Sequence, residues 1–307
     1  MKLSIVVPLY NEKDSLAILM TKIAETLVPL GHEYEVVFVD DGSTDGSFKA
    51  LKELREKYGE IVRIYRFCRN YGKSAGLSVG IREAAGDVIV TMDADLQDDP
   101  AAIPEMLAKL DEGYDLVSGW KKKRYDPLSF KLPSKLWNSV TSVMSGVKLH
   151  DFNCGFKAYR ADVAKSLDIY GDRHRYLPAL AHWDGFRVTE IPVPHHPRQF
   201  GKSKYGFGKF FNGVMDMLTL LFLKRYLKSP LHFFGLLGLV LIVLGSGILL
   251  AFGIQWAMTG GLHVRPLMLL SMGAIIMGIQ FVSFGFLAEM ITHMAPKDTY
   301  KIRDRIE

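Results

Sequence analysis

The chain of 307 residues contains very little cysteine. Cys68 and Cys154 are its two cysteines, and no C-x-x-C spacing occurs. A disulfide framework and a cysteine-based zinc site both need more thiols than this, so the sequence excludes both. We expect two packed, reduced cysteines in a cytosol-facing protein.

A signal-peptide core is missing from the first residues, where the apolar run before Pro8 is only a few residues long. We therefore expect that this segment does not export the chain. Hydrophobic residues make up 49% of the sequence, which excludes a chain that is mainly disordered. The net charge of +5 is compatible with nucleic acid, a membrane surface or phosphate-bearing substrates, and composition does not choose among them.

Charge of either sign is absent from two long stretches. Residues 231–264 contain no Asp, Glu, Lys or Arg, and neither do residues 266–288. Each stretch exceeds the roughly 20 residues that cross a bilayer core. Buried helices of a soluble protein are the alternative, but segments this long and charge-free favour the membrane. The sequence therefore predicts two transmembrane helices, about 231–256 and 266–290, within residues 229–295.

The charges around these stretches predict their orientation. The link between them is short and contains glycines, so we expect an antiparallel hairpin. Arg265 is the one cation in the link, whereas several cations flank the hairpin. The positive-inside rule then places both flanks, including a tail of residues 296–307, in the cytoplasm. We expect a multi-pass protein of the cell (inner) membrane. The flanking cations are Lys224, Arg225, Lys228, Lys297, Lys301, Arg303 and Arg305.

The first 198 residues or so alternate short apolar runs with segments of helical periodicity, which predicts a parallel sheet covered by helices. Residues 3–9, 34–40 and 87–93 are apolar enough to be strands buried on both faces. Helix caps are predicted at Asp14, at Ser43 or Asp45, and at Asp99 ahead of Pro100. In such α/β sheets ligands bind beyond the carboxyl ends of the strands.

Residues 207–228 carry large apolar side chains at mixed helical spacing, with cations near both ends. An amphipathic helix that closes the soluble domain fits this pattern as well as one on the membrane surface. The position directly before the first transmembrane segment favours juxtamembrane amphipathic helices at the interface.

The segment "TMDADLQDDP" (residues 91–100) ends the third predicted strand in four acidic residues. Asp93 and Asp95 point the same way, and Gln97 has the same parity. An all-oxygen set of this kind suits Mg²⁺ or Mn²⁺, with substrate phosphates completing the coordination shell. We predict Asp93, Asp95 and Gln97 as metal ligands, and Asp98 and Asp99 as caps. A lone Asp-x-Asp is often only a turn, so the prediction depends on the motifs around it.

Those motifs are "VVPLYNE" (6–12), "VDDGSTDGS" (39–47) and "RNYGKSAGL" (69–77), followed in order by "DADLQD". Together they resemble the GT-A fold of glycosyltransferase family 2, over essentially the whole soluble domain. The resemblance implies a Rossmann-like nucleotide-sugar-binding α/β domain, which we place at residues 1–206. Each motif residue has a structural alternative as a strand end or turn. Implied nucleotide-sugar ligands are Pro8, Tyr10, Glu12, Val39, Asp41, Lys73, Asp93, Ala94 and Asp95.

"DFNCGFKAYR" (151–160) and "HHPRQFGKSKYG" (195–206) resemble acceptor-side motifs of polyprenyl-phosphate glycosyltransferases, the group that includes dolichol-phosphate mannose synthases. The second motif carries Arg198, Lys202 and Lys204, which suit the phosphates of donor and acceptor. A solvated loop is the alternative there, as it is for "KKKR" (121–124). We predict Asp95, Arg198 and Lys204 as catalytic residues. Predicted acceptor ligands are Arg124, Asn153, Lys157 and Lys202.

Gly155 and two adjacent histidines bear on this interpretation. Some family members carry an Asp, proposed as a catalytic base, directly before the Phe of the "GF" motif, where this chain has Gly155. A phosphate monoester is a nucleophilic dianion near neutral pH and needs no base, so an inverting single displacement by a lipid phosphate is expected. The adjacent His195 and His196 point in opposite directions, so hydrogen bonding within the loop is expected rather than joint metal binding.

The sequence thus predicts an inverting, metal-dependent transfer of one sugar from a UDP- or GDP-sugar to undecaprenyl or dolichyl phosphate, by a cytoplasmic catalytic domain. One alternative is a membrane enzyme of polysaccharide synthesis with a hydroxyl acceptor, although the Gln-x-x-Arg-Trp motif of processive synthases is absent. The other is a non-catalytic membrane subunit that retains the fold. We expect no nucleic-acid partner, and the sequence leaves homo-oligomerisation open without indicating an interface.

Overall fold

The computed structural model describes residues 1–122, 138, 141–142, 145–169, 173–197, 229–260 and 266–294. It divides into two compact units, Met1–Met217 and Leu218–Glu307. The predicted amphipathic helices at 207–228 and the tail at 296–307 lie outside the described residues.

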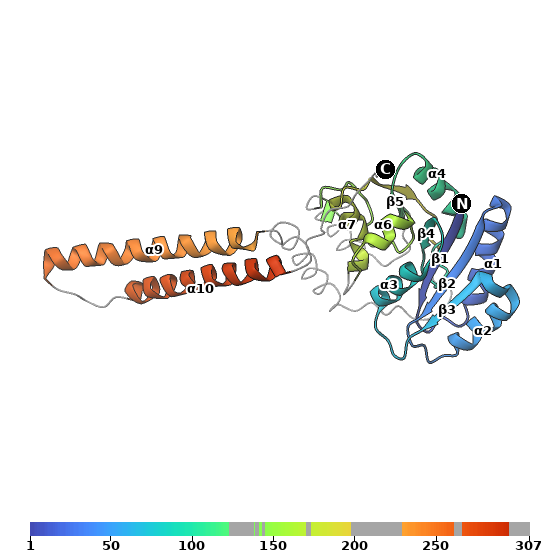
Figure 1. Cartoon of the computed structure of the whole chain (residues 1–307), viewed down its shortest axis with the longest axis horizontal. Coiled ribbons are helices and arrows are strands. Elements are labelled where there is room, and N and C mark those ends of the chain that lie inside the picture. Colours follow the sequence, from blue (N-terminus) through green and yellow to red (C-terminus); the bar gives the residue numbers. More distant parts are fainter. Residues whose placement is uncertain are drawn as a thin grey trace. The chain divides into compact units, whose positions relative to one another are not determined.

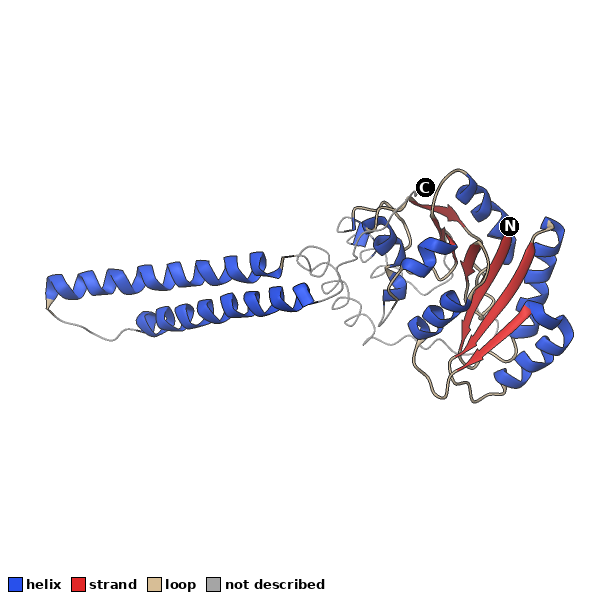
Figure 2. Ribbon diagram, viewed as in Figure 1, coloured by secondary structure: helices blue, strands red, loops and turns tan. Residues whose placement is uncertain are grey.

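The first unit contains a sheet whose described strands run in the order β3-β2-β1-β4-β6-β5-β7 (Figures 1 and 2). Four strands, β1 to β4, pair in parallel, as the sequence predicts. β6 departs from that prediction, because it inserts antiparallel between β4 and β5, while β7 is parallel to β5. The sheet is therefore mixed. The strands are β1 (Lys2–Leu9), β2 (Glu33–Asp40), β3 (Val62–Arg66), β4 (Val88–Thr91), β5 (Leu116–Trp120), β6 (Lys157–Arg160) and β7 (Val188–Pro192).

Helices cover both faces of this sheet (Figure 1). Alternate residues of β1 show why: Ile5 and Val7 pack in one core and Val6 in the other, all fully buried. The first core also holds side chains of α1 (Leu16–Leu27), α2 (Ser47–Tyr58) and α4 (Ile103–Asp111). The second holds side chains of α3 (Lys73–Glu83), α6 (Ala161–Ser166) and α7 (Leu177–Trp183). Burial on both faces accounts for the continuous apolar runs in the sequence.

The helix starts agree with the predicted caps only in part. Asp14 is not the cap of α1, because that position falls to Ser15, whose hydroxyl donates to the carbonyl of Glu12. At α2 the carboxylate of Asp45 accepts from the backbone N–H of Ser47 at 2.9 Å, although Gly46 holds the cap position. Asp99 accepts from the N–H of Ala101, so that prediction is confirmed.

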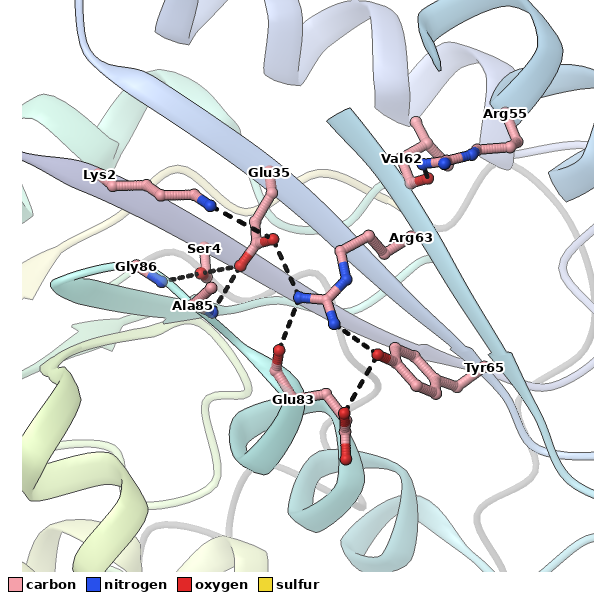
Figure 3. Close-up of polar contacts among 10 residues, drawn as sticks. All are labelled: Lys2, Ser4, Glu35, Arg55, Val62, Arg63, Tyr65, Glu83, Ala85 and Gly86. Atoms are coloured by element: carbon pink, nitrogen blue, oxygen red, sulfur yellow. Dashed lines mark hydrogen bonds and ion pairs between the residues drawn. The ribbon is translucent and has the colours of Figure 1, made fainter. Parts of the chain in front are cut away.

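A network of charged and polar side chains joins the amino-terminal halves of β1, β2 and β3 (Figure 3). Glu35 is only 4% exposed and accepts hydrogen bonds from the Ser4 hydroxyl, the Ala85 N–H and Arg63. Arg63 also donates to the carbonyl of Glu83 and to the hydroxyl of Tyr65. Burial would raise the pKa of Glu35, but these donors outweigh it and lower the pKa. We call these residues, together with Lys2, the Glu35 network.

The second unit is a pair of long helices, α9 (Pro230–Thr259) and α10 (Pro266–Met294). They are somewhat longer than the predicted 231–256 and 266–290, and both are long and apolar enough to cross a membrane. Glycines let the two backbones approach closely. A Cβ on Gly238 would lie 2.5 Å from the carbonyl oxygen of Gly278, and one on Gly245 would lie 2.6 Å from that of Ser271. Gly238 faces Gly278, whereas Gly245, further along α9, faces the earlier residue Ser271 of α10. The two helices therefore run antiparallel, which confirms the predicted hairpin.

Candidate active site

The acidic turn after β4 presents two carboxylates at the carboxyl ends of the parallel strands. The side chain of Asp93 is 29% exposed, and Asp95 is 9% exposed. The chain turns at Leu96, between Asp95 and Gln97. Leu96 has a φ of 62°, which is unusual for a residue other than glycine. The Leu96 side chain is buried in the core, and the Asp95 carboxylate accepts from the N–H of Gln97. Core packing of Leu96 therefore fixes the turn that carries Asp95 and Gln97.

Asp93 forms an ion pair with Lys73, the first residue of α3. Burial on its own would raise the pKa of Asp93. The ammonium groups of Lys73 and Lys121 outweigh that effect and lower the pKa to about 2. Asp93 is therefore ionised throughout the physiological pH range.

Lys121 lies inside the site rather than in a solvated run. Its ammonium pairs with Asp98 at 2.8 Å, and the Asp98 side chain is fully buried. Burial opposes the charge on Lys121, but Asp98 and the neighbouring Cys154 and Asp93 outweigh it and raise the Lys121 pKa. Asp98 is thus the buried counter-ion of Lys121 and not the predicted cap.

Gly155 faces the ion pair of Lys73 and Asp93. A Cβ at this position would lie 2.8 Å from Oδ2 of Asp93 and 2.9 Å from Nζ of Lys73. The Gly155 carbonyl accepts from the Thr91 hydroxyl at 2.8 Å, which ties this backbone to β4. The space that a side chain would need is occupied by the carboxylate and the ammonium. A side chain at this position would have to displace the carboxylate or the ammonium.

The first acceptor-side motif brings Lys157 near this pair, because the charges of Lys73 and Asp93 act on it. Lys157 is 1% exposed, and its ammonium donates to the carbonyl of Cys154. Burial is the main cause that lowers the pKa of Lys157. The N–H of Asn153 donates to Asp151, while the buried side-chain oxygen of Asn153 has no hydrogen-bond partner in the described part of the chain.

The two cysteines differ in their surroundings. Cys154 is buried, as predicted, and burial raises the pKa of its thiol to about 12, which keeps it neutral. Cys68 is exposed, so the prediction of a packed cysteine is wrong there.

The predicted nucleotide ligands are divided between the core and the surface. Val39 and Ala94 are buried apolar side chains of the two cores, so only their backbone groups can meet a ligand. Pro8 is also buried, whereas Tyr10 and Glu12 are partly exposed at the end of β1.

Asp41 follows the end of β2. Its carboxylate oxygens accept from the N–H groups of Tyr71 and Gly72 at 2.6 and 2.8 Å. Asp41 therefore holds the loop that leads into α3, which begins with Lys73.

Sequence reasoning did not identify His174, which belongs to the short helix η4 (Arg173–Arg175). Its Nδ1 lies 2.8 Å from the hydroxyl of Ser74, the residue after Lys73. Burial, then the positive charges of Lys73 and Arg175, lower the pKa of His174 well below its usual value. The imidazole is therefore neutral. No motif or spacing in the sequence links the two segments.

His196 confirms the expectation of hydrogen bonding near its loop. Its N–H donates to the carbonyl of Gln97 at 2.9 Å, and its Nε2 lies 3.1 Å from Oδ2 of Asp99. Asp98 and His195 form an isolated antiparallel bridge. The acidic turn is thus joined to the second acceptor-side motif. The other predicted cations of that side, Arg124, Arg198, Lys202 and Lys204, lie outside the described residues.

The donor groups of the acidic turn fit a hard divalent cation. Within the described ranges, no three His, Cys, Asp or Glu side chains gather as a complete cage. Mg²⁺ is commonly held by one or two carboxylates with substrate phosphates and water completing its shell. Asp93 and Asp95 supply two carboxylates, and Gln97 is partly exposed beside them in the chain.

Comparison with known proteins assigns the family. A model of glycosyl transferase family 2 matches residues 4–168. The chain belongs to this family. Its 303 aligned residues are 38% identical to dodecaprenyl-phosphate galacturonate synthase of Rhizobium johnstonii, covering 97% of this chain and 90% of that protein. It is 37% identical to an undecaprenyl-phosphate 4-deoxy-4-formamido-L-arabinose transferase of Klebsiella pneumoniae, covering 94% and 88%. The protein is a glycosyltransferase.

Solved structures support the fold of this glycosyltransferase. Glucosyl-3-phosphoglycerate synthase from Mycobacterium tuberculosis, in complex with Mn²⁺, UDP and phosphoglyceric acid, superposes with a TM-score of 0.55 at 16% identity, covering 73% of this chain and 78% of that one. The mannosyltransferase PcManGT from Pyrobaculum calidifontis, in complex with GDP-Man and Mn²⁺, gives a TM-score of 0.52 at 17% identity, covering 96% and 76%. The predicted GT-A fold followed by two apolar helices is confirmed.

Proposed function

We propose that this glycosyltransferase transfers a single sugar from a UDP- or GDP-sugar to undecaprenyl or dolichyl phosphate, with inversion at the anomeric carbon and with Mg²⁺ or Mn²⁺. Relatives named for sugar transfer to a polyprenyl phosphate align over nearly the whole chain. The chain also has two helices apolar enough to hold it in the membrane that carries such an acceptor.

The observation that carries the proposal is the composition of the site. Asp93 pairs with Lys73 and also interacts with the charges of Lys121 and Lys157, and Asp95 follows it two residues along the same turn. Carboxylates suit the divalent ion, and the ammonium groups suit phosphate on the donor and on the acceptor. A site for neutral sugar hydroxyls would not need such a density of cations.

The chemistry at Gly155 agrees with a phosphate nucleophile. Residue 155 is a glycine, so it has no side chain that could act as a base. A phosphate dianion attacks the anomeric carbon without losing a proton, and the nucleoside diphosphate leaves from the opposite face. One new C–O bond forms as the bond to the diphosphate breaks, which inverts the configuration.

The residues then have distinct roles. Asp93 and Asp95, with Gln97, hold the divalent ion, which when bound stabilises the negative charge of the diphosphate. Pro8, Tyr10, Glu12, Val39 and Asp41 surround the nucleotide at the strand ends. Arg198 and Lys204 stabilise the leaving group, and Arg124, Asn153, Lys157 and Lys202 bind the acceptor.

We further propose the arrangement in the cell. Residues 1–206 form the catalytic domain on the cytoplasmic side of the inner membrane, and residues 207–228 lie along the membrane surface. The hairpin within 229–295 spans the bilayer and residues 296–307 return to the cytoplasm. The charge distribution around the hairpin supports this orientation.

The test uses the full chain in detergent with labelled nucleotide sugars. Each donor is offered with undecaprenyl phosphate, with dolichyl phosphate, or with undecaprenol, which carries a hydroxyl in place of the phosphate. We expect one sugar to be transferred to a lipid phosphate, with loss of transfer in EDTA and no product with undecaprenol. Transfer to undecaprenol at a similar rate, or no transfer with any donor, would overturn the proposal.

A further inference from the structure

Lys73 lies where both the divalent ion and the donor diphosphate are proposed to bind. Its ammonium pairs with Asp93, one of the two carboxylates proposed to hold the divalent ion. Lys73 is also the first residue of α3 and directly follows the loop that Asp41 holds. This is the part of the site proposed for the donor diphosphate. A carboxylate whose charge is already matched by an ammonium attracts a second cation less strongly.

The carboxylate of Asp93 is paired on one side and faces backbone on the other. Oδ1 pairs with Lys73, and Oδ2 faces Gly155. The Gly155 backbone is itself fixed by the hydrogen bond from Thr91. A cation that approaches Asp93 must therefore compete with the ammonium of Lys73.

Two neighbouring groups, Lys121 and His174, have buried partners. Lys121 pairs with the fully buried Asp98, and His174 is hydrogen-bonded to Ser74. The side chain of Lys73, in contrast, is 31% exposed and ends a flexible four-carbon stem. Lys73 can therefore move to another anion without breaking a buried ion pair between fixed partners.

We propose that Lys73 is an exchangeable counter-ion: it neutralises Asp93 in the donor-free enzyme and moves to the diphosphate when the donor binds. Asp93 is thereby released to the divalent ion at the moment the donor arrives. The inference rests on the proposed function, and it adds that metal and donor bind cooperatively. It also predicts that the metal alone binds weakly.

The test measures Mn²⁺ binding to the full chain in detergent by electron paramagnetic resonance, first with Mn²⁺ alone and then with saturating UDP or GDP. Lys73→Met removes the competing charge, and Lys73→Arg keeps it. Lys49→Met is the matched control, because Lys49 is an exposed residue of α2. Circular dichroism verifies that each variant is folded.

We expect Lys73→Met to bind Mn²⁺ alone at least about tenfold more tightly than the wild type, because an adjacent charge changes the affinity of a carboxylate for a cation by that order. Lys73→Arg and Lys49→Met should bind it as weakly as the wild type. The nucleotide should increase Mn²⁺ affinity strongly in the wild type and much less in Lys73→Met.

Two results would overturn the inference, and they are distinguishable. If the wild type binds Mn²⁺ but Lys73→Met binds it no more tightly, Lys73 is not a competitor and the proposed function is unaffected. If the wild type binds no Mn²⁺ with either nucleotide, the metal site of the proposed function fails and the counter-ion role fails with it.

Discussion

The sheet of the first unit carries two clusters of charged side chains that differ in how completely they are satisfied. In the Glu35 network, near the amino ends of the strands, one buried carboxylate is surrounded by several donors that match it. At the carboxyl ends, Asp93 remains 29% exposed, and Lys157 donates to a backbone carbonyl instead of a carboxylate. The carboxylate of the first cluster is fully matched by donors, whereas the second cluster, which we propose binds anionic ligands, is partly exposed.

The largest expected effect is the loss of sugar transfer when the Asp95 carboxylate is neutralised. Asp95→Asn removes a ligand charge while keeping the shape of the side chain, so transfer should fall by at least about a hundredfold. Labelled-product assays on the full chain measure the rate. Asp111→Asn, an exposed residue at the end of α4, is the control and should leave it unchanged. Wild-type activity in Asp95→Asn would contradict the metal assignment.

A methyl group at position 155 tests how closely the ion pair is packed. Its Cβ would lie within 3 Å of both Asp93 and Lys73, so Gly155→Ala should force them apart and reduce transfer by about tenfold or more. Gly247→Ala is the control, because a Cβ at Gly247 meets nothing within 4 Å. Equal activity in the two variants would show that the pair is not confined as described.

The pH dependence of transfer distinguishes the enzyme carboxylate from the acceptor. The pKa of Asp93 is lowered to about 2, so Asp93 stays ionised until the pH falls towards 2. The lipid phosphate loses its second proton near pH 6, so the rate should decline about tenfold per pH unit below that value. Rate profiles of the wild type and Lys73→Met provide the measurement. An acid limb that shifts with Lys73→Met would assign it to Asp93 instead.

The smallest effect on activity is expected in the Glu35 network. Glu35→Ala leaves Arg63 without its carboxylate, which should lower the free energy of unfolding by about 2–4 kcal/mol. The turnover of the protein that remains folded should be unchanged. Thermal unfolding of the full chain in detergent, with the exposed Glu53→Ala on α2 as control, checks the stability. Loss of turnover at wild-type stability would make the network part of the active site.

The lowered pKa of Glu35 also predicts how the stability of the fold changes with pH. A carboxylate with a lowered pKa stabilises the fold above its unfolded-state value, and the stabilisation is lost as the pH falls through the folded-state value. The stability of the wild type should therefore decline on the acid side of about pH 4, and that of Glu35→Ala should decline less.

Regular features of the fold were predictable from the sequence because they leave periodic or compositional signals. The apolar runs at β1, β2 and β4 and the long apolar helices α9 and α10 occur where predicted. β6 has only four residues, so no pattern in the sequence could indicate that it runs antiparallel.

Side-chain partners in the site were less predictable. Lys121 begins a run of cations that reads as a solvated surface, yet it turns inward to Asp98, because tertiary packing and not local spacing decides its direction. The contact between Ser74 and His174 joins residues 100 positions apart and carries no local signal. Asp93 and Asp95 were predictable because both follow directly after an apolar strand segment, which is visible in the sequence.

The most direct test of the central claim combines the acceptor and the metal in one assay. The full chain is incubated with a labelled donor and undecaprenyl phosphate, with Mg²⁺ present or chelated, beside Asp95→Asn. The account predicts a single-sugar lipid product whose anomeric configuration is opposite to the donor's, formed only with the metal and the intact carboxylate. A product of retained configuration, or undiminished transfer without the metal or without the Asp95 charge, would contradict it.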